Sequence, residues 1–147
     1  MSQAGVALRL HAIGHSPITD LIGERFRPIH DAQGDDFPRV TYQQISCLPD
    51  EGLHGDAGHE TVRLQFNIYD NDSTRAHRIS RLVRKRLLTA FGTLPIDNEP
   101  EPATIYVTGV STAGGIRDAH TAAPADKSEQ WLHGATFDLM VSYNPSE

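Results

Sequence analysis

The chain has 147 residues, 38% hydrophobic and 22% charged, with a formal net charge of −6 at pH 7. This size and balance are typical of one globular domain and exclude a disordered or collagen-like chain. The single cysteine, Cys47, excludes an internal disulfide framework, and we expect it to be half-buried rather than a nucleophile. The sequence has no apolar run of membrane-spanning length and no signal-peptide pattern, so we expect synthesis in a cytoplasm and no membrane partner.

The first part of the chain predicts two helices, a loop and a strand. Apolar residues at helical spacing predict a helix over residues 3–14. Pro17 begins a second, short helix that ends at Gly23. Residues 26–38 contain two prolines and a cluster of Asp and Gly, which predicts a loop. Residues 39–48 are β-prone and predict a strand.

The middle of the chain has the clearest periodicity. Residues 49–60 contain three glycines and four acids and predict the tip of a hairpin. Residues 61–70 alternate apolar and polar side chains, which predicts a half-buried antiparallel strand. Acids and a capping residue then precede a helix expected over residues 74–91, which Gly92 ends.

The last third predicts two more strands separated by a long loop. Residues 93–102 are expected to form an acidic, proline-rich linker, and strands are expected at 103–110 and 135–144. We expect the loop at 111–130 to be mobile in the free subunit and to become ordered on docking, since long loops are often functional. The sequence therefore predicts a single α+β domain over residues 1–147, with an antiparallel sheet and helices packed on one face.

The most unusual feature is a basic segment, residues 73–88, which carries six of the thirteen Lys and Arg residues and no acid. Without it, the remaining chain carries −12. At about 100° per residue, an apolar stripe faces the core, the cations lie opposite or beside it, and two leucines project among them. The candidate interface residues are Arg75, Arg78, Arg81, Leu82, Arg84, Lys85, Arg86 and Leu88.

Three hypotheses explain this basic segment. A solvated helix face explains its periodicity. A protein interface also explains the missing acids, which would usually supply pairs within the helix, and the leucines among the arginines. A nucleic-acid-binding or DNA-guiding module using residues 75–86 is the third, although base-reading side chains do not accompany the stripe and the acidic remainder would repel phosphate.

Motifs of known catalytic chemistry are missing from the sequence. Residues 111–117 are glycine-rich but lack the lysine of a phosphate-binding loop, and the nucleophile elbow Gly-x-Ser-x-Gly does not occur. We therefore expect no catalytic residues, no cofactor and no enzyme activity. His54, Asp56 and His59 leave a small metal-dependent hydrolase as a minor alternative, although their spacing fits no compact ligand geometry.

Three segments, "LIGERFRPI", "FPRVTYQQIS" and "LHGDAGHETVRLQFNIYDNDSTRAHRISRLVRKRL", resemble the tail-completion (tail-terminator) proteins of long-tailed bacteriophages and phage-derived particles. The resemblance covers about residues 5–90 and consists of framework residues rather than a catalytic signature. The positions that match are Leu21, Ile22, Gly23, Arg25, Pro38, Val40, Tyr42, Gly55, Gly58, Val62, Leu64, Gln65 and the helix that begins at Ser73.

The resemblance implies an α+β virion structural protein whose subunits form a ring, typically a hexamer. Such a ring caps the finished tail tube, ends tube polymerisation and joins the tail to the head. The implied partners are further copies of the chain, the tail tube protein and a head-completion or neck protein, with non-specific contact to DNA passing through the ring. The implied location is the tail and neck of the virion, after assembly in the cytoplasm of the host bacterium.

A closed head-to-tail ring needs two different, complementary patches on every subunit. A basic helix on an acidic chain suits such a ring, because opposite charges favour the correct neighbour and register. We therefore expect Arg78, Arg81 and Lys85 to meet an acidic surface on an adjacent subunit or on the tail tube, with Leu82 or Leu88 at the contact.

Overall fold

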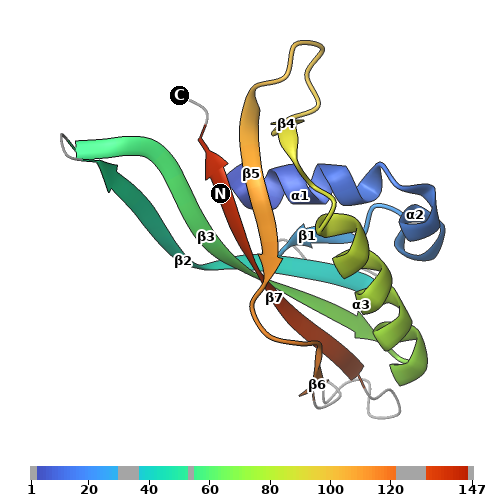
Figure 1. The fold of residues 1–147 in the computed structure, drawn as a ribbon. Helices are drawn as coiled ribbons and strands as arrows, with labels where there is room; N and C mark the ends of the chain where they lie inside the picture. Colours follow the sequence, from blue (N-terminus) through green and yellow to red (C-terminus); the bar gives the residue numbers. More distant parts are fainter. Residues whose placement is uncertain (1–2, 30–36, 53–54, 122–131, 146–147) are drawn as a thin grey trace.

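The computed structural model describes residues 3–29, 37–52, 55–121 and 132–145 and has an α+β fold (Figure 1). Seven strands form one curled sheet in the order β1-β2-β3-β7-β5-β4, and β6 also pairs with β7. The elements are α1 (Gln3–Ile13), α2 (Ser16–Ile22), β1 (Phe26–Pro28), β2 (Arg39–Gly52), β3 (Gly55–Asp70), α3 (Ser73–Leu87), β4 (Gly92–Pro95), β5 (Thr104–Thr112), β6 (Arg117–Thr121) and β7 (Leu132–Asn144).

The centre of the sheet is the antiparallel pair of β3 and β7, whose sequences both alternate apolar and polar residues. The apolar side chains of both strands are buried on the face that α1 and α3 cover. The register places Phe66 opposite Phe137, and their rings stack with 5.3 Å between centroids. The opposite face is polar, with Asp138 held by Arg63 and Arg117 at 2.7 and 3.1 Å. The predicted placement of helices on one face is therefore found among the described residues.

Helix α3 begins where the sequence predicts a cap. The Asp72 carboxylate accepts hydrogen bonds from the backbone N–H groups of Thr74 (3.0 Å) and Arg75 (3.3 Å), two donors that have no partner within the helix. The helix ends earlier than the predicted 74–91. The Thr89 hydroxyl donates to the Arg86 carbonyl at 2.6 Å, and a serine or threonine bond of this kind competes with the helical pattern. No helix in the described part of the chain is long and apolar enough to cross a membrane.

Several segments expected to be irregular form strands. The predicted loop 26–38 contains β1, which runs parallel to β2, so the sheet is mixed rather than wholly antiparallel. The predicted linker 93–102 begins within β4, and the strands of the hairpin extend through most of the predicted tip at 49–60. The loop expected at 111–130 contains β6, and its residues 122–130 lie outside the described residues. Strands β1, β4 and β6 are short, and pairing with a longer neighbour replaces a sequence signal of their own.

The end of α3 is tied to α1 by two side chains. Arg86 Nε donates to the backbone oxygen of His11 at 3.1 Å, and His11 Nε2 lies 3.0 Å from Thr89 Oγ1. The His11 imidazole is therefore held between the two helices, beside the guanidinium of Arg86.

The position of His11 predicts a dependence of stability on pH. Burial, followed by the charge of Arg86, lowers the pKa of His11 below its usual 6.5. As the pH falls through 6.5, the unfolded chain binds a proton at this histidine before the folded chain does, so the free energy of unfolding decreases. We expect His11→Gln to weaken this decrease between about pH 7 and about pH 5, measured by urea unfolding across that range. An unchanged slope in His11→Gln would contradict the prediction.

Candidate interaction surface

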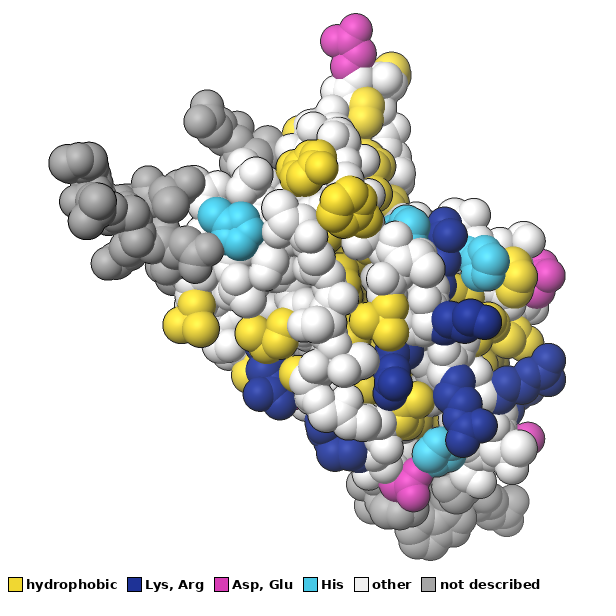
Figure 2. Space-filling model, viewed as in Figure 1, with side chains coloured by type: hydrophobic (Ala, Val, Ile, Leu, Met, Phe, Trp, Pro, Cys, Tyr) yellow, Lys and Arg dark blue, Asp and Glu magenta, His cyan; other side chains and the backbone are white. Residues whose placement is uncertain are grey.

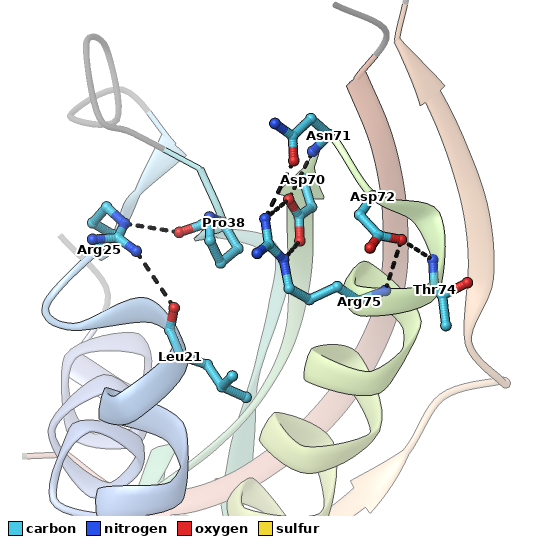
Figure 3. Close-up of polar contacts among 8 residues, drawn as sticks. All are labelled: Leu21, Arg25, Pro38, Asp70, Asn71, Asp72, Thr74 and Arg75. Carbon is cyan, nitrogen blue, oxygen red and sulfur yellow. Dashed lines mark hydrogen bonds and ion pairs between the residues drawn. The ribbon is translucent and has the colours of Figure 1, made fainter.

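Arg75 belongs to the fold rather than to the free surface of α3. Its guanidinium binds the Asp70 carboxylate through Nε at 2.5 Å and Nη2 at 2.6 Å, and Nη2 also donates to the Asn71 side chain at 3.2 Å (Figure 3). Asp70 is fully buried. The hydrogen bond to this carboxylate raises the pKa of Arg75 above its already high usual value. The pair therefore joins the end of β3 to the first turn of α3.

Two of the eight candidate interface residues are thus engaged within the chain: Arg75 with Asp70, and Arg86 with the His11 carbonyl. Both partners come from other elements. Since a protein interface would have to compete with these bonds, the other members of the set are the better candidates for binding a partner.

Arg78, Arg81 and Lys85 are the exposed cations among the candidates, and we call them the basic row. They lie at helical spacings of three and four residues, which places them along one side of α3. Within the described residues, none of the three makes a hydrogen bond or an ion pair. Figure 2 shows Lys and Arg side chains gathered over the part of the surface where α3 lies. The basic row is therefore free to bind an external anion or acidic side chain.

A groove of about 920 Å³ runs between α2 and α3, beside the basic row. We call it the basic groove. Pro17, Leu21 and Leu82 give it apolar walls, and Asp20 is the one acid on its lining. Leu82 was expected to project away from the core, but it is partly buried against the core and reaches the groove with one side. The surface next to the cations thus offers apolar area as well as charge.

A second, smaller groove of about 560 Å³ adjoins the same row. Arg84 and Leu88 line it together with Ile116, which follows β5 in the chain. The Leu88 side chain is 36% exposed, in agreement with the expected position of this leucine among the arginines. Six of the eight candidate interface residues therefore lie around two adjoining grooves.

Strand β6 brings an acid to the beginning of the basic row. His77 Nε2 forms a hydrogen bond with Asp118 Oδ1 of β6. The sequence gives no signal for this contact, because the two residues are 41 positions apart and β6 lies within a predicted loop. Asp118 therefore limits the positive surface at the end of the row near His77.

Cys47 lies on β2 and is exposed, which corrects the expectation of a half-buried side chain. Beyond Tyr42, β2 leaves the part of the sheet that the helices cover, and residues 44–48 are all exposed. Partial desolvation by neighbouring atoms, followed by the charge of Glu60, whose Oε2 lies 3.7 Å from Sγ, raises the pKa of the Cys47 thiol. The environment of Cys47 therefore disfavours the thiolate that a nucleophile requires.

The metal hypothesis falls partly outside the described residues, because His54 is not among them. Within the described part of the chain, no group of three His, Cys, Asp or Glu residues is arranged to hold a metal ion. The hypothesis of a metal site at His54, Asp56 and His59 stays a prediction.

Four of the framework residues that carry the family resemblance meet at the junction of α2 and β2. Gly23 ends α2 with φ +58°, a conformation that favours glycine. Arg25 then donates from Nε to the Pro38 carbonyl at 2.9 Å and from Nη2 to the Leu21 carbonyl at 3.4 Å (Figure 3). The first two segments of the resemblance are therefore in direct contact.

Comparison with known proteins adds no family assignment. A scan against protein-family models and a search of curated proteins each found no match. The function is therefore inferred from the residues and geometry of the chain itself.

Proposed function

We propose that this chain is a structural, non-catalytic subunit of a phage tail or a phage-derived particle. In this proposal it forms a ring of the tail-terminator type, which caps the tail tube, ends tube polymerisation and joins the tail to the neck. One observation carries the proposal: an otherwise acidic chain places three exposed cations, Arg78, Arg81 and Lys85, beside a partly apolar groove, and none of them has a partner within the described residues. Exposed arginines next to apolar area are typical of protein interfaces, and opposite charges select the correct neighbour.

Two further observations support a ring. First, four of the framework residues of the resemblance, Leu21, Gly23, Arg25 and Pro38, form one connected junction. Second, the β2–β3 hairpin extends away from the body of the protein, at the opposite end from α3 (Figure 1). A subunit with two different surfaces far apart is suited to the head-to-tail contacts of a closed ring.

Charge reversal on the basic row tests the proposal. We expect Arg78→Glu/Arg81→Glu to weaken assembly roughly 100-fold, because like charges brought together at an interface cost several kcal/mol. Native mass measurement and light scattering of the purified proteins would give the subunit number and the concentration at which the ring dissociates. Because these arginines have no partner within the described residues, the midpoint of unfolding should stay close to that of the wild type. Unchanged ring formation by this variant would contradict the role of the basic row.

The same variant separates the ring from the nucleic-acid alternative, which would use the same cations. A mobility-shift assay with duplex DNA at low ionic strength gives phosphate contacts their best chance, since these contacts weaken steeply as salt is added. If the wild type forms a ring and binds no DNA, and the variant does not form the ring, the structural role is favoured. If the wild type forms no ring but binds DNA, and the variant loses that binding, the nucleic-acid alternative is favoured.

A further inference from the structure

The hairpin formed by β2 and β3 carries charge opposite to that of the basic groove. We call the portion beyond the helix-covered sheet, residues 44–52 of β2 and 55–60 of β3, the acidic arm. It contains four acids, Asp50, Glu51, Asp56 and Glu60, and neither Lys nor Arg. Glu60 already accepts a hydrogen bond from the Tyr143 hydroxyl at 2.7 Å, so the other three are the better candidates for binding a partner. The acidic arm is thus a candidate partner for Arg78, Arg81 and Lys85.

The register of the hairpin adds a second reason for the arm to bind cations. Glu51 and Asp56 occupy paired positions on the two strands, near the end of the arm. The pairing of the two strands therefore brings two of the four acid positions to the same place in the arm.

The acidic arm also exposes apolar side chains. Leu48 is 63% exposed and Ile45 is 47% exposed, and Ile45 lies at an irregularity in the register between Gln44 and Ser46. A bulge of this kind commonly re-aims a side chain. The arm therefore offers apolar area together with negative charge, whereas the basic groove offers the apolar Leu21 and Leu82 together with positive charge.

The arm of one chain is directed away from α3 of the same chain, and the two lie at opposite ends of the molecule (Figure 1). An arm that fills a basic groove must therefore come from a second copy. A contact between two different surfaces leaves one of each free on every subunit, so it continues from copy to copy until the ring closes.

We propose that the acidic arm of one subunit docks into the basic groove between α2 and α3 of the next. Leu48 packs toward Leu21 and Leu82, and the acids of the arm meet Arg78, Arg81 and Lys85. This inference rests on the proposed ring and names the contact that builds it.

An exchange of charge between two variants tests the contact. The arm variant is Glu51→Lys/Asp56→Lys, and the groove variant is Arg78→Glu/Arg81→Glu. We expect each alone to associate roughly 100-fold more weakly than the wild type, since each brings like charges together. Mixing the two should restore assembly, because each arm then meets a groove of opposite charge. Sedimentation measures the association of the wild type, the two variants and their mixture. The ionic strength is kept at 0.01 M, where the screening length is about 30 Å.

Crosslinking through the natural Cys47, which adjoins Leu48 on the arm, gives an independent measurement. In the variant Asp20→Cys a second thiol lies in the basic groove, and a short thiol-specific crosslinker should produce a ladder of covalent oligomers. Asp20→Cys/Cys47→Ser should give no ladder, because only contacts between arm and groove join the two positions. A cysteine at Thr93, which is exposed on β4, serves as the matched control and should give none in the presence of Cys47.

The outcomes separate this inference from the proposed function. Two weakened variants, rescue on mixing and a ladder specific to Asp20→Cys would support the docking of arm into groove. A wild-type ring that neither variant weakens, or that the mixture fails to restore, would overturn the docking and leave the ring intact. A wild type that stays monomeric at every concentration and gives no ladder would overturn both.

Discussion

Phe66→Ala is expected to lower the free energy of unfolding by about 3–5 kcal/mol, the usual cost of removing a fully buried aromatic ring. Phe66 lies on the central strand β3 with no exposed area. Its ring centroid is 5.3 Å from that of Phe137, 6.1 Å from that of Phe26 and 6.3 Å from that of Tyr42. The loss is large because these contacts join β1, β2, β3 and β7, so the cavity would open where four strands meet.

Phe91→Ala is the matched control for this experiment. The same atoms are removed, but Phe91 is 65% exposed and makes one edge-on ring contact, with Tyr106. We expect a loss of under about 1 kcal/mol, since exposed positions contribute little. Urea unfolding followed by circular dichroism measures both variants. Equal losses would show that burial at Phe66 does not determine the stability of the sheet.

Arg75→Leu is expected to destabilise the protein by about 3 kcal/mol at neutral pH, because it leaves the fully buried Asp70 carboxylate without its cation. The Asn71 backbone N–H still donates to Asp70 at 2.7 Å, which compensates only part of the charge. The double variant Arg75→Leu/Asp70→Asn should recover part of the loss, since no uncompensated charge then remains buried.

Arg78→Leu separates the role of the ion pair from that of the residue type. It is the same substitution on the next turn of the same helix, at an exposed arginine without a partner in the described chain. We expect a change within about 0.5 kcal/mol. Thermal and urea unfolding of the two single variants measure the loss of stability. An equal loss in Arg78→Leu and Arg75→Leu would contradict this division of roles. The comparison also shows which arginines of α3 hold the fold and which remain for a partner.

The sequence predicts the elements that depend on local pattern. Residues 61–70 and 135–144 alternate over enough positions to specify both a strand and its buried face, and β3 and β7 follow that alternation. The apolar stripe of α3 and its cap at Asp72 depend on neighbours within one or two turns, so they too can be predicted from the sequence.

Strands β1, β4 and β6 could not be predicted, because three to five residues are too short to show a period. Each forms by pairing with the longer strand that follows it in the chain, as β1 does with β2, β4 with β5 and β6 with β7. The mixed character of the sheet and the place of Asp118 beside His77 follow from these pairings.

The sequence by itself determined that α3 is basic, amphipathic and without acids, since charge and helical spacing are local properties. Only the tertiary structure decided which of its cations are free. Arg75 is engaged by an acid at the end of β3, and Arg86 by a carbonyl 75 residues away in α1, whereas Arg78, Arg81 and Lys85 face the groove beside α2. The physical reason is that an arginine is occupied only when packing brings an acceptor within reach, and distant elements supply those acceptors.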